Sequence, residues 1–128
     1  MTHYITLLHV DDDASFGALV RDWLERSEGD IEVTTVTSVE AALELLNDPD
    51  HGFDVVVSDY CMPAASGLEL FEWLCERDFG LPFVLFTGQG NEAVAHDTRV
   101  AGVTDYVRKS GGPDSLSLLV RRVRSVVE

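Results

Sequence analysis

Short runs of apolar residues alternate along the chain with longer segments in which apolar residues recur every three or four positions. The short runs are rich in Val, Ile, Leu and aromatic residues, and they lie at residues 4–10, 31–36, 53–58, 83–87 and 104–107. Runs of this kind are typical of strands that are buried on both faces of a parallel sheet. The pattern therefore predicts five strands.

Each predicted strand is followed by a segment with helical spacing. In the first of these segments the apolar residues share one helical face, at Phe16, Leu19, Val20, Trp23 and Leu24. The same spacing predicts helices around residues 39–46, 68–74 and 116–127, whereas residues 91–101 carry few apolar side chains. We therefore expect the fourth helix to be the least firmly packed. Five successive βα units indicate an α/β fold, with a parallel sheet covered by helices on both faces.

Helix boundaries are also marked in the sequence. Thr37 with Glu40 and Ser66 with Glu69 have the spacing of capping boxes, which begin helices. Helices are expected to end near glycine or proline, at Gly29, Pro49, Gly80 and Gly102. Because the sequence shows no repeat or linker, we expect residues 1–128 to form one domain.

Composition argues against several classes of protein. The chain has 23 acidic and 9 basic side chains and a formal net charge of -14, so its surface repels the phosphates of nucleic acid. No apolar stretch approaches the ~20 residues that cross a bilayer, and no basic start of a signal peptide is present. Cys61 and Cys75 form neither a disulfide scaffold nor a zinc motif. We expect a soluble cytoplasmic protein with no direct contact to nucleic acid or membrane.

The balance of charges is typical of proteins from salt-loving organisms. Among the nine basic residues only Lys109 is a lysine, and so large an excess of acid destabilises the compact state by self-repulsion. Molar salt shortens the Debye length to ~3 Å and removes most of that repulsion. We expect a halophilic protein, with an acidic protein from a mesophile as the alternative.

Side chains able to carry out chemistry follow four of the five predicted strands, where each strand ends. They are Asp11, Asp12 and Asp13 after the first strand, Asp59 after the third, Thr87 at the end of the fourth and Lys109 after the fifth. The carboxyl ends of parallel strands meet at one edge of the sheet, where ligands bind in folds of this class. We expect these side chains to form one pocket.

The expected pocket collects negative charge. Asp11, Asp12 and Asp59 would lie within a few ångströms, where each like-charge pair costs on the order of 3 kcal/mol at an effective dielectric constant of about 20. Hard oxygen ligands of this kind suit Mg²⁺, and Lys109 supplies a fixed positive charge. A carboxylate nucleophile beside Mg²⁺, a lysine and the Thr87 hydroxyl predicts phosphoryl transfer to an aspartate.

Four of these segments resemble the response-regulator receiver family of two-component signalling, and the resemblance covers essentially the whole chain. Residues 7–13 are similar to the family's first strand and acidic pair, and residues 59–63 with Gly67 to its phosphoacceptor segment. Residues 83–88 and 105–109 are similar to its fourth and fifth strands. The resemblance implies a flavodoxin-like (βα)5 fold, a doubly wound sandwich whose five-stranded parallel sheet has the order 2-1-3-4-5.

The resemblance also implies roles for the acidic residues. Asp59 would accept the phosphoryl group, and Mg²⁺ or Mn²⁺ would be held by Asp12, Asp59 and the backbone carbonyl of Cys61. Asp11 would act on the metal mainly through a water molecule. Asp13 lies outside the acidic pair and is expected to be a first-turn charge on the first helix.

Phosphoryl binding and switching involve three further residues in this family. Thr87 and Lys109 would hold oxygens of the phosphoryl group, and Tyr106 would rotate into the space that Thr87 leaves. One departure from the family pattern follows the lysine, where Ser110 and two glycines stand in place of the usual proline. We expect a more mobile loop there, which would allow the lysine to approach the pocket differently.

The implied partners are those of a phosphorelay. A sensor histidine kinase or a phosphotransfer protein would supply the phosphoryl group, and a downstream effector or a fused output domain would read the signal. The signal would leave through the fourth helix, the fifth strand and the fifth helix, a face that also offers a homodimer contact. We expect this face to bind acidic groups, with a solvated helix end as the alternative, through Arg108, Lys109, Arg121, Arg122 and Arg124. Apart from its own phosphorylation and dephosphorylation, the chain would not be an enzyme.

Two other classes of protein fit single motifs. A haloacid-dehalogenase-type phosphatase shares the D-x-D pattern of Asp11 and Asp13, but it needs a later acidic pair, and only Asp114 and Glu128 follow the lysine. A nucleotide-binding domain fits the G-x-G-x-x-A pattern of residues 88–93, although such a loop should follow the first strand.

Two further interpretations concern the role of His9 and the possibility that the fold serves without phosphorylation. Only His9 among the four histidines lies near the expected pocket, and we interpret it as a packed residue rather than as part of a triad. A receiver that has lost phosphorylation would keep the fold as an interaction module, but the retained pocket residues argue against it.

Overall fold

A computed structural model of the chain describes residues 4–60, 62, 65–77, 79–88, 103–109 and 113–127. Five parallel strands form one sheet in the order β2-β1-β3-β4-β5. Their bounds are β1 (Ile5–Val10), β2 (Ile31–Val36), β3 (Val55–Ser58), β4 (Phe83–Thr87) and β5 (Asp105–Arg108). The prediction of a doubly wound sheet of order 2-1-3-4-5 is confirmed.

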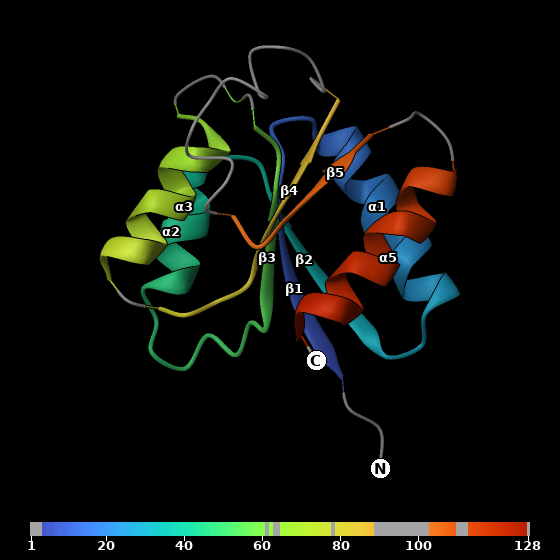
Figure 1. The fold of residues 1–128 in the computed structure, drawn as a ribbon, viewed down its shortest axis with the longest axis horizontal. Coiled ribbons are helices and arrows are strands. Elements are labelled where there is room, and N and C mark those ends of the chain that lie inside the picture. Colours follow the sequence, from blue (N-terminus) through green and yellow to red (C-terminus); the bar gives the residue numbers. More distant parts are fainter. Residues whose placement is uncertain are drawn as a thin grey trace.

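Helices cover both faces of the sheet. The described helices are α1 (Ala14–Ser27), α2 (Val39–Leu46), α3 (Gly67–Glu76) and α5 (Pro113–Val127). In Figure 1, α1 and α5 lie on one side of the strands, and α2 and α3 lie on the other. The fourth helix, expected at residues 91–101, falls outside the described residues.

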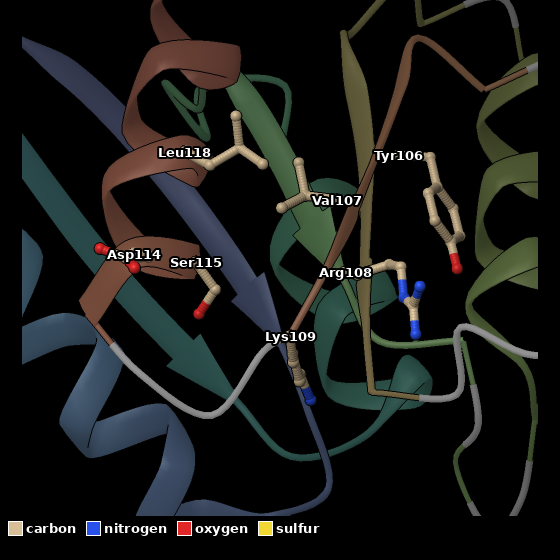
Figure 2. A pocket seen from close by; sticks show the side chains of 7 residues that line it. All are labelled: Tyr106, Val107, Arg108, Lys109, Asp114, Ser115 and Leu118. Atoms are coloured by element: carbon tan, nitrogen blue, oxygen red, sulfur yellow. The ribbon is translucent and has the colours of Figure 1, made fainter.

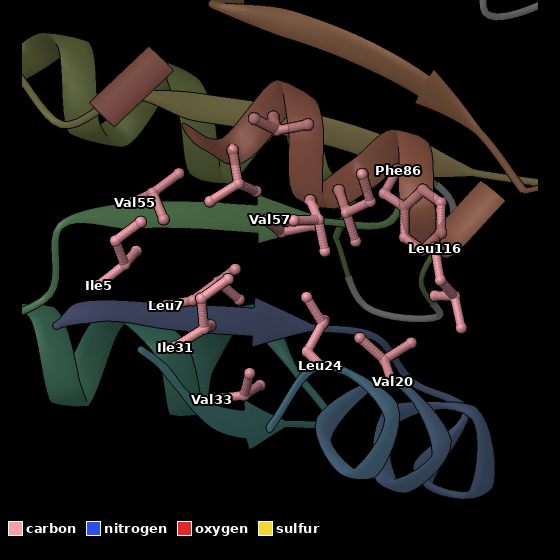
Figure 3. Close-up of a cluster of buried hydrophobic side chains, with 14 of the residues drawn as sticks. Ile5, Leu7, Val20, Leu24, Ile31, Val33, Val55, Val57, Phe86 and Leu116 are labelled. Atoms are coloured by element: carbon pink, nitrogen blue, oxygen red, sulfur yellow. The ribbon is translucent and has the colours of Figure 1, made fainter. Parts of the chain in front are cut away.

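Alternation along the strands divides the core into two layers. Leu7 of β1 packs between the sheet and α1 with α5, whereas its neighbour Leu8 packs on the side of α2 and α3. Figure 3 shows the first layer, in which side chains of β1, β2 and β3 meet those of α1 and α5. Both leucines are fully buried. Because both faces of the strands are buried, their sequences are continuous apolar runs rather than alternating apolar and polar residues.

The third strand is shorter than expected, starting at Val55 rather than at residue 53. The backbone N–H of Phe53 donates to Nδ1 of His51 at 2.8 Å instead of to a neighbouring strand. The next N–H, of Asp54, donates to the carbonyl of Thr6 at 2.8 Å and brings the chain alongside β1. A histidine turn therefore replaces the first part of the predicted strand.

The helix starts confirm one predicted cap, move another by one residue and show a third that was expected to be a first-turn charge. Ser66 Oγ accepts from the N–H of Glu69 at 3.3 Å, as the capping spacing predicted. At α2 the cap is Ser38, one residue after Thr37, because Ser38 is extended and its Oγ accepts from Ala41 at 3.1 Å. Asp13 is the N-cap of α1 rather than a first-turn charge, since its Oδ1 accepts from the N–H of Phe16. Each cap satisfies one of the free N–H groups at a helix start.

Two of the arginines expected to form a docking face are bound within the chain. Arg124 of α5 donates to Glu28 and Asp30 in the α1–β2 turn, at 2.7 to 2.8 Å. The guanidinium holds the pKa of Asp30 below its usual value, through hydrogen bonding first and charge second. Arg122 pairs with Asp105 of β5 at 3.2 Å. Arg124 is therefore engaged within the chain, whereas Arg122 keeps 49% of its side-chain exposure, and the binding of acidic partners by this face stays a prediction.

None of the helices in the described ranges combines the length and apolarity needed to span a membrane.

Candidate functional site

The pocket begins where β1 and β3 end side by side. Val10 and Ser58 are partners in the parallel ladder, so Asp11 and Asp59 follow at adjacent positions. The N–H of Asp59 donates to the carbonyl of Val10 at 2.9 Å, which continues the pairing one step beyond the strands. The sheet register therefore brings together two carboxylates that are far apart in the sequence.

Asp12 completes a cluster of three acidic side chains. Oxygen atoms of Asp11, Asp12 and Asp59 all lie within 4.8 Å of one another. Asp11 is buried and Asp12 is exposed, while the side chain of Asp59 keeps 13% of its exposure. The cluster thus opens to solvent on the side of Asp12.

Lys109 reaches this cluster from the end of β5. The backbone N–H of Lys109 donates to the backbone carbonyl of Thr87 at 3.0 Å, which continues the pairing of β4 with β5. Its Nζ donates to Asp11 Oδ2 at 2.7 Å and to Asp59 Oδ2 at 3.2 Å. The side chain is only 17% exposed, so these charged hydrogen bonds are partly shielded from water.

The charges in the cluster do not balance. Three carboxylates face one ammonium group among the described residues. Carboxylate oxygens are the ligands that Mg²⁺ prefers, and a divalent cation would offset the two remaining negative charges. The residues of the pocket therefore fit a magnesium site. The backbone carbonyl of Cys61, expected as a further ligand, lies outside the described residues.

The second carboxylate oxygen of Asp59 is fixed by the backbone of the next residue. Oδ1 accepts from the N–H of Tyr60 at 2.8 Å, so the carboxylate has one oxygen on the backbone and the other on Lys109. Gly67 allows this turn to fold, since a Cβ there would overlap the carbonyl oxygen of Asp59 and lie 2.8 Å from Ser58 Oγ. The N–H of Gly67 donates to the carbonyl of Tyr60 at 2.9 Å. The start of α3 is thus held directly against the Asp59 segment.

Thr87 and Tyr106 lie on neighbouring strands and on the same face of the sheet. Leu85 pairs with Tyr106 and Thr87 pairs with Arg108, so all four side chains point to one side. Thr87 is fully buried at the carboxyl end of β4, and Tyr106 is partly buried. The loop after Lys109, which was expected to be mobile, lies outside the described residues.

His9 lies beneath the pocket and is completely buried. Its ring nitrogens have no hydrogen-bond partner in the described part of the chain. Burial lowers the pKa of His9 to about 4, an effect that Asp11 opposes and Lys109 reinforces. The imidazole is therefore neutral near pH 7. It packs edge-on against Phe16, with 6.3 Å between ring centroids, as the interpretation of His9 as a packed residue expected.

Sequence reasoning missed the aromatic wall of the pocket. Lys109 Nζ lies 4.4 Å from the centroid of the Phe16 ring and 5.8 Å from that of Phe86. In the sequence, Phe16 is one of several apolar residues on the inner face of α1, and the helical spacing alone does not distinguish it from Val20 or Leu24. Its position three residues after the Asp13 cap, in the turn that follows the acidic pair, was the available signal.

Comparison with known proteins agrees with this arrangement. The family model described as "Response regulator receiver domain" matches residues 7–121. The chain therefore belongs to the response regulator receiver domain family.

Individual relatives extend the comparison. The response regulator SaeR of Staphylococcus aureus is 32% identical over 126 residues, which are 96% of this chain and 50% of SaeR. The chain thus spans about half the length of the curated relatives it matches.

Among solved structures, the receiver domain of the Francisella response regulator 1452 superposes with a TM-score of 0.80, at 25% identity and 96% coverage of both chains. TrrA of Thermotoga maritima, solved in complex with Mg²⁺-BeF, has a TM-score of 0.78 at 25% identity, covering 93% of this chain and 98% of TrrA. TrrA has also been solved in complex with the histidine kinase ThkA.

Proposed function

We propose that this chain is the phosphoacceptor module of a two-component phosphorelay and that Asp59 takes the phosphoryl group. The observation that carries the proposal is the bridge from Lys109 Nζ to Asp11 and Asp59 inside a cluster of three carboxylates. A fixed ammonium beside a partly exposed carboxylate neutralises the charge of an approaching phosphoryl group without reorganisation. Asp11 is too buried to take that role, because its side chain is 1% exposed.

The proposed reaction is a displacement at phosphorus. A carboxylate oxygen of Asp59 forms a bond to phosphorus while the bond between phosphorus and the donor atom breaks. The electron pair of the broken bond stays with the leaving group. From a phosphohistidine the leaving group is an imidazole nitrogen, which takes up a proton from solvent, and from acetyl phosphate it is acetate.

Residues around Asp59 position and neutralise the transferred group in this proposal. The N–H of Tyr60 orients the Asp59 carboxylate through Oδ1. Lys109 and the hydroxyl of Thr87 would each hold a phosphoryl oxygen, through charge-assisted hydrogen bonds. Asp11, Asp12 and Asp59 would hold Mg²⁺ or Mn²⁺, which supplies the remaining positive charge that the phosphoryl oxygens need. The Mg²⁺-BeF complex of TrrA supports this choice of ion.

The donor in this proposal is a sensor histidine kinase or a phosphotransfer protein. The complex of TrrA with the histidine kinase ThkA supports it, because TrrA shares this fold at a TM-score of 0.77 and 25% identity. The chain would work as a signalling module rather than as an enzyme with turnover, and its location in the cytoplasm stays a prediction from the sequence.

Output would pass through β5 and α5 to a downstream effector or a fused output domain. Thr87 and Tyr106 face the same side of β4 and β5, so a Thr87 hydroxyl drawn toward a phosphoryl oxygen leaves space on the side of Tyr106. Residues of β5 and α5 line a cavity of about 610 Å³. Figure 2 shows Tyr106 and Arg108 on one side of β5, and Val107 and Leu118 on the other. A partner segment or a second copy of the chain would dock beside this cavity.

Incubation of the chain with acetyl phosphate and Mg²⁺, followed by intact-mass measurement, tests the proposal. We expect one phosphoryl group per chain, no labelling of Asp59→Asn, and no labelling after EDTA. Asp13→Asn is the matched control, because it removes a neighbouring carboxylate and keeps a residue that caps helices well. Full labelling of Asp59→Asn would overturn the assignment, and release of phosphate in many turnovers would favour the phosphatase alternative.

A further inference from the structure

Lys109 has a third contact in the pocket, and this contact is not a carboxylate. The Nζ atom lies over the ring of Phe16, 4.4 Å from its centroid, in addition to its bonds with Asp11 and Asp59. This distance is within the range of a cation–π interaction, in which the negative face of the ring attracts the ammonium. The ring of Phe86 is farther away, at 5.8 Å.

The Phe16 ring is itself firmly placed. The N–H of Phe16 donates to the Asp13 cap at 3.0 Å, which fixes the first turn of α1. The ring packs against Phe86 of β4 at 5.9 Å and against the edge of His9 at 6.3 Å between centroids. These contacts hold the Phe16 ring in a fixed position against the Lys109 ammonium.

The proposed reaction gives new partners to two of the three groups that Lys109 contacts, and it leaves the third unchanged. Asp59 would receive the phosphoryl group, and Asp11 belongs to the carboxylate cluster that fits a metal ion. Both carboxylates would then have other partners, and their hold on Lys109 would weaken. The Phe16 face takes no part in either event.

We propose that Phe16 is a positioning residue for phosphoryl transfer, whose ring face keeps the Lys109 ammonium aimed into the pocket when Asp11 and Asp59 are otherwise engaged. The inference rests on the proposed function. A leucine at this position would fill the space and bury the lysine stem, but it has no negative face. The aromatic character of the ring, rather than its bulk, is what the proposal requires.

Lys109 can be observed directly because it is the only lysine in the chain. Incorporation of lysine labelled with ¹³C at Cε gives a single side-chain NMR signal, from Lys109. Protons held over a ring face are shielded, so the Hε signal of the wild-type chain is expected upfield of its position in free lysine. The upfield shift should persist after addition of Mg²⁺ and beryllofluoride.

Three variants distinguish the effect of the aromatic ring face at Phe16 from the effect of side-chain bulk. Phe16→Leu should return the Lys109 signal toward the free-lysine position, whereas Phe16→Tyr should keep it upfield. Phe71→Leu is the control, because Phe71 is a partly buried ring of α3 that packs on Phe83, within the other core layer. Thermal melts of all variants show whether each is folded before its spectrum is compared. A Lys109 signal that is not shifted in the wild type, or is unchanged in Phe16→Leu, overturns the contact.

The same variants test the consequence for phosphorylation. Phe16→Leu should slow labelling by acetyl phosphate between about twofold and thirtyfold, which corresponds to the usual range of cation–π energies. Phe16→Tyr should restore most of the rate, and Phe71→Leu should leave it unchanged. A wild-type chain that takes no label contradicts the proposed function. A wild-type chain that is labelled, with Phe16→Leu labelled equally fast, contradicts the positioning role alone.

Discussion

Lys109 and Asp11 are 98 residues apart in the sequence, and their side chains meet with 2.7 Å between Nζ and Oδ2. Asp11 is the most buried carboxylate of the pocket, with 1% of its side chain exposed. The only lysine of the chain thus makes its shortest hydrogen bond with the carboxylate that water reaches least. Lys109 also donates to Asp59 at 3.2 Å, but one ammonium group cannot neutralise three carboxylates, so the remaining repulsion in the cluster is left to solvent or to a bound cation.

This imbalance predicts that Mg²⁺ stabilises the chain. A ligand that binds only the folded state at a hundredfold excess over its Kd adds about 2.7 kcal/mol to the free energy of unfolding. Asp12→Asn should raise the melting temperature slightly without metal, because it removes a like charge, and should lose most of the gain with Mg²⁺. Melting curves with and without Mg²⁺ measure both effects. Asp13→Asn should respond like the wild type, and an equal Mg²⁺ response in Asp12→Asn would argue against a metal at this cluster.

Gly67→Ala is predicted to destabilise the fold next to Asp59. The added Cβ would overlap the Asp59 carbonyl oxygen, and the backbone of β3 or α3 would have to move. We expect a loss of about 1–3 kcal/mol in the free energy of unfolding, as for other overpacked sites. Urea denaturation measures it, and Gly29→Ala is the control, because nothing lies within 4 Å of a Cβ there. Equal stabilities of the two variants would contradict the described turn.

The ion pair between Arg124 and Asp30 predicts a pH-dependent contribution to stability. Asp30 has a lowered pKa in the folded chain, whereas an unfolded aspartate titrates at about 3.9. Its contribution is therefore present above that value and is lost as the pH falls through the folded pKa. Arg124→Gln should lower the melting temperature at pH 7, and the difference from the wild type should shrink in acid. Arg26→Gln removes an exposed pair with Asp22 and should have little effect at either pH. A difference that stays constant down to the acid limit would show that Asp30 is not the linked group.

The excess of acidic residues predicts that salt stabilises the chain. With a net charge of -14, screening of self-repulsion should raise the melting temperature as KCl increases into the molar range. Thermal melts in a KCl series measure this directly. A melting temperature that is flat or falls over the series would contradict the halophilic interpretation.

Much of the pocket could be predicted because a parallel sheet fixes where strands end. Once β1, β3 and β5 were assigned from their apolar runs, Asp11, Asp59 and Lys109 had to lie at one edge. Features that depend on one-residue register were harder to predict. Thr37 and Ser38 are both good caps by residue type, and the backbone conformation of Ser38 decides between them.

Contacts between distant side chains could not be predicted from local patterns. The helical spacing places Phe16 on the inner face of α1 but does not say that Lys109 crosses its ring. The spacing of α5 places Arg124 away from the apolar stripe but cannot show its partners Glu28 and Asp30, which belong to a turn 96 and 94 residues earlier in the chain. Charge patterns show which residues need partners, and only the fold shows which partners are near.

Localisation of the phosphoryl group tests the central claim most directly. The chain is labelled with acetyl phosphate and Mg²⁺ and digested, and tandem mass spectrometry assigns the modified residue. We predict that the phosphoryl group is found on the peptide that contains Asp59 and is absent from the peptide that contains Asp11, Asp12 and Asp13. A phosphoryl group on one of those first-strand aspartates, with Asp59 unmodified, would contradict the account and place the nucleophile where a D-x-D phosphatase has it.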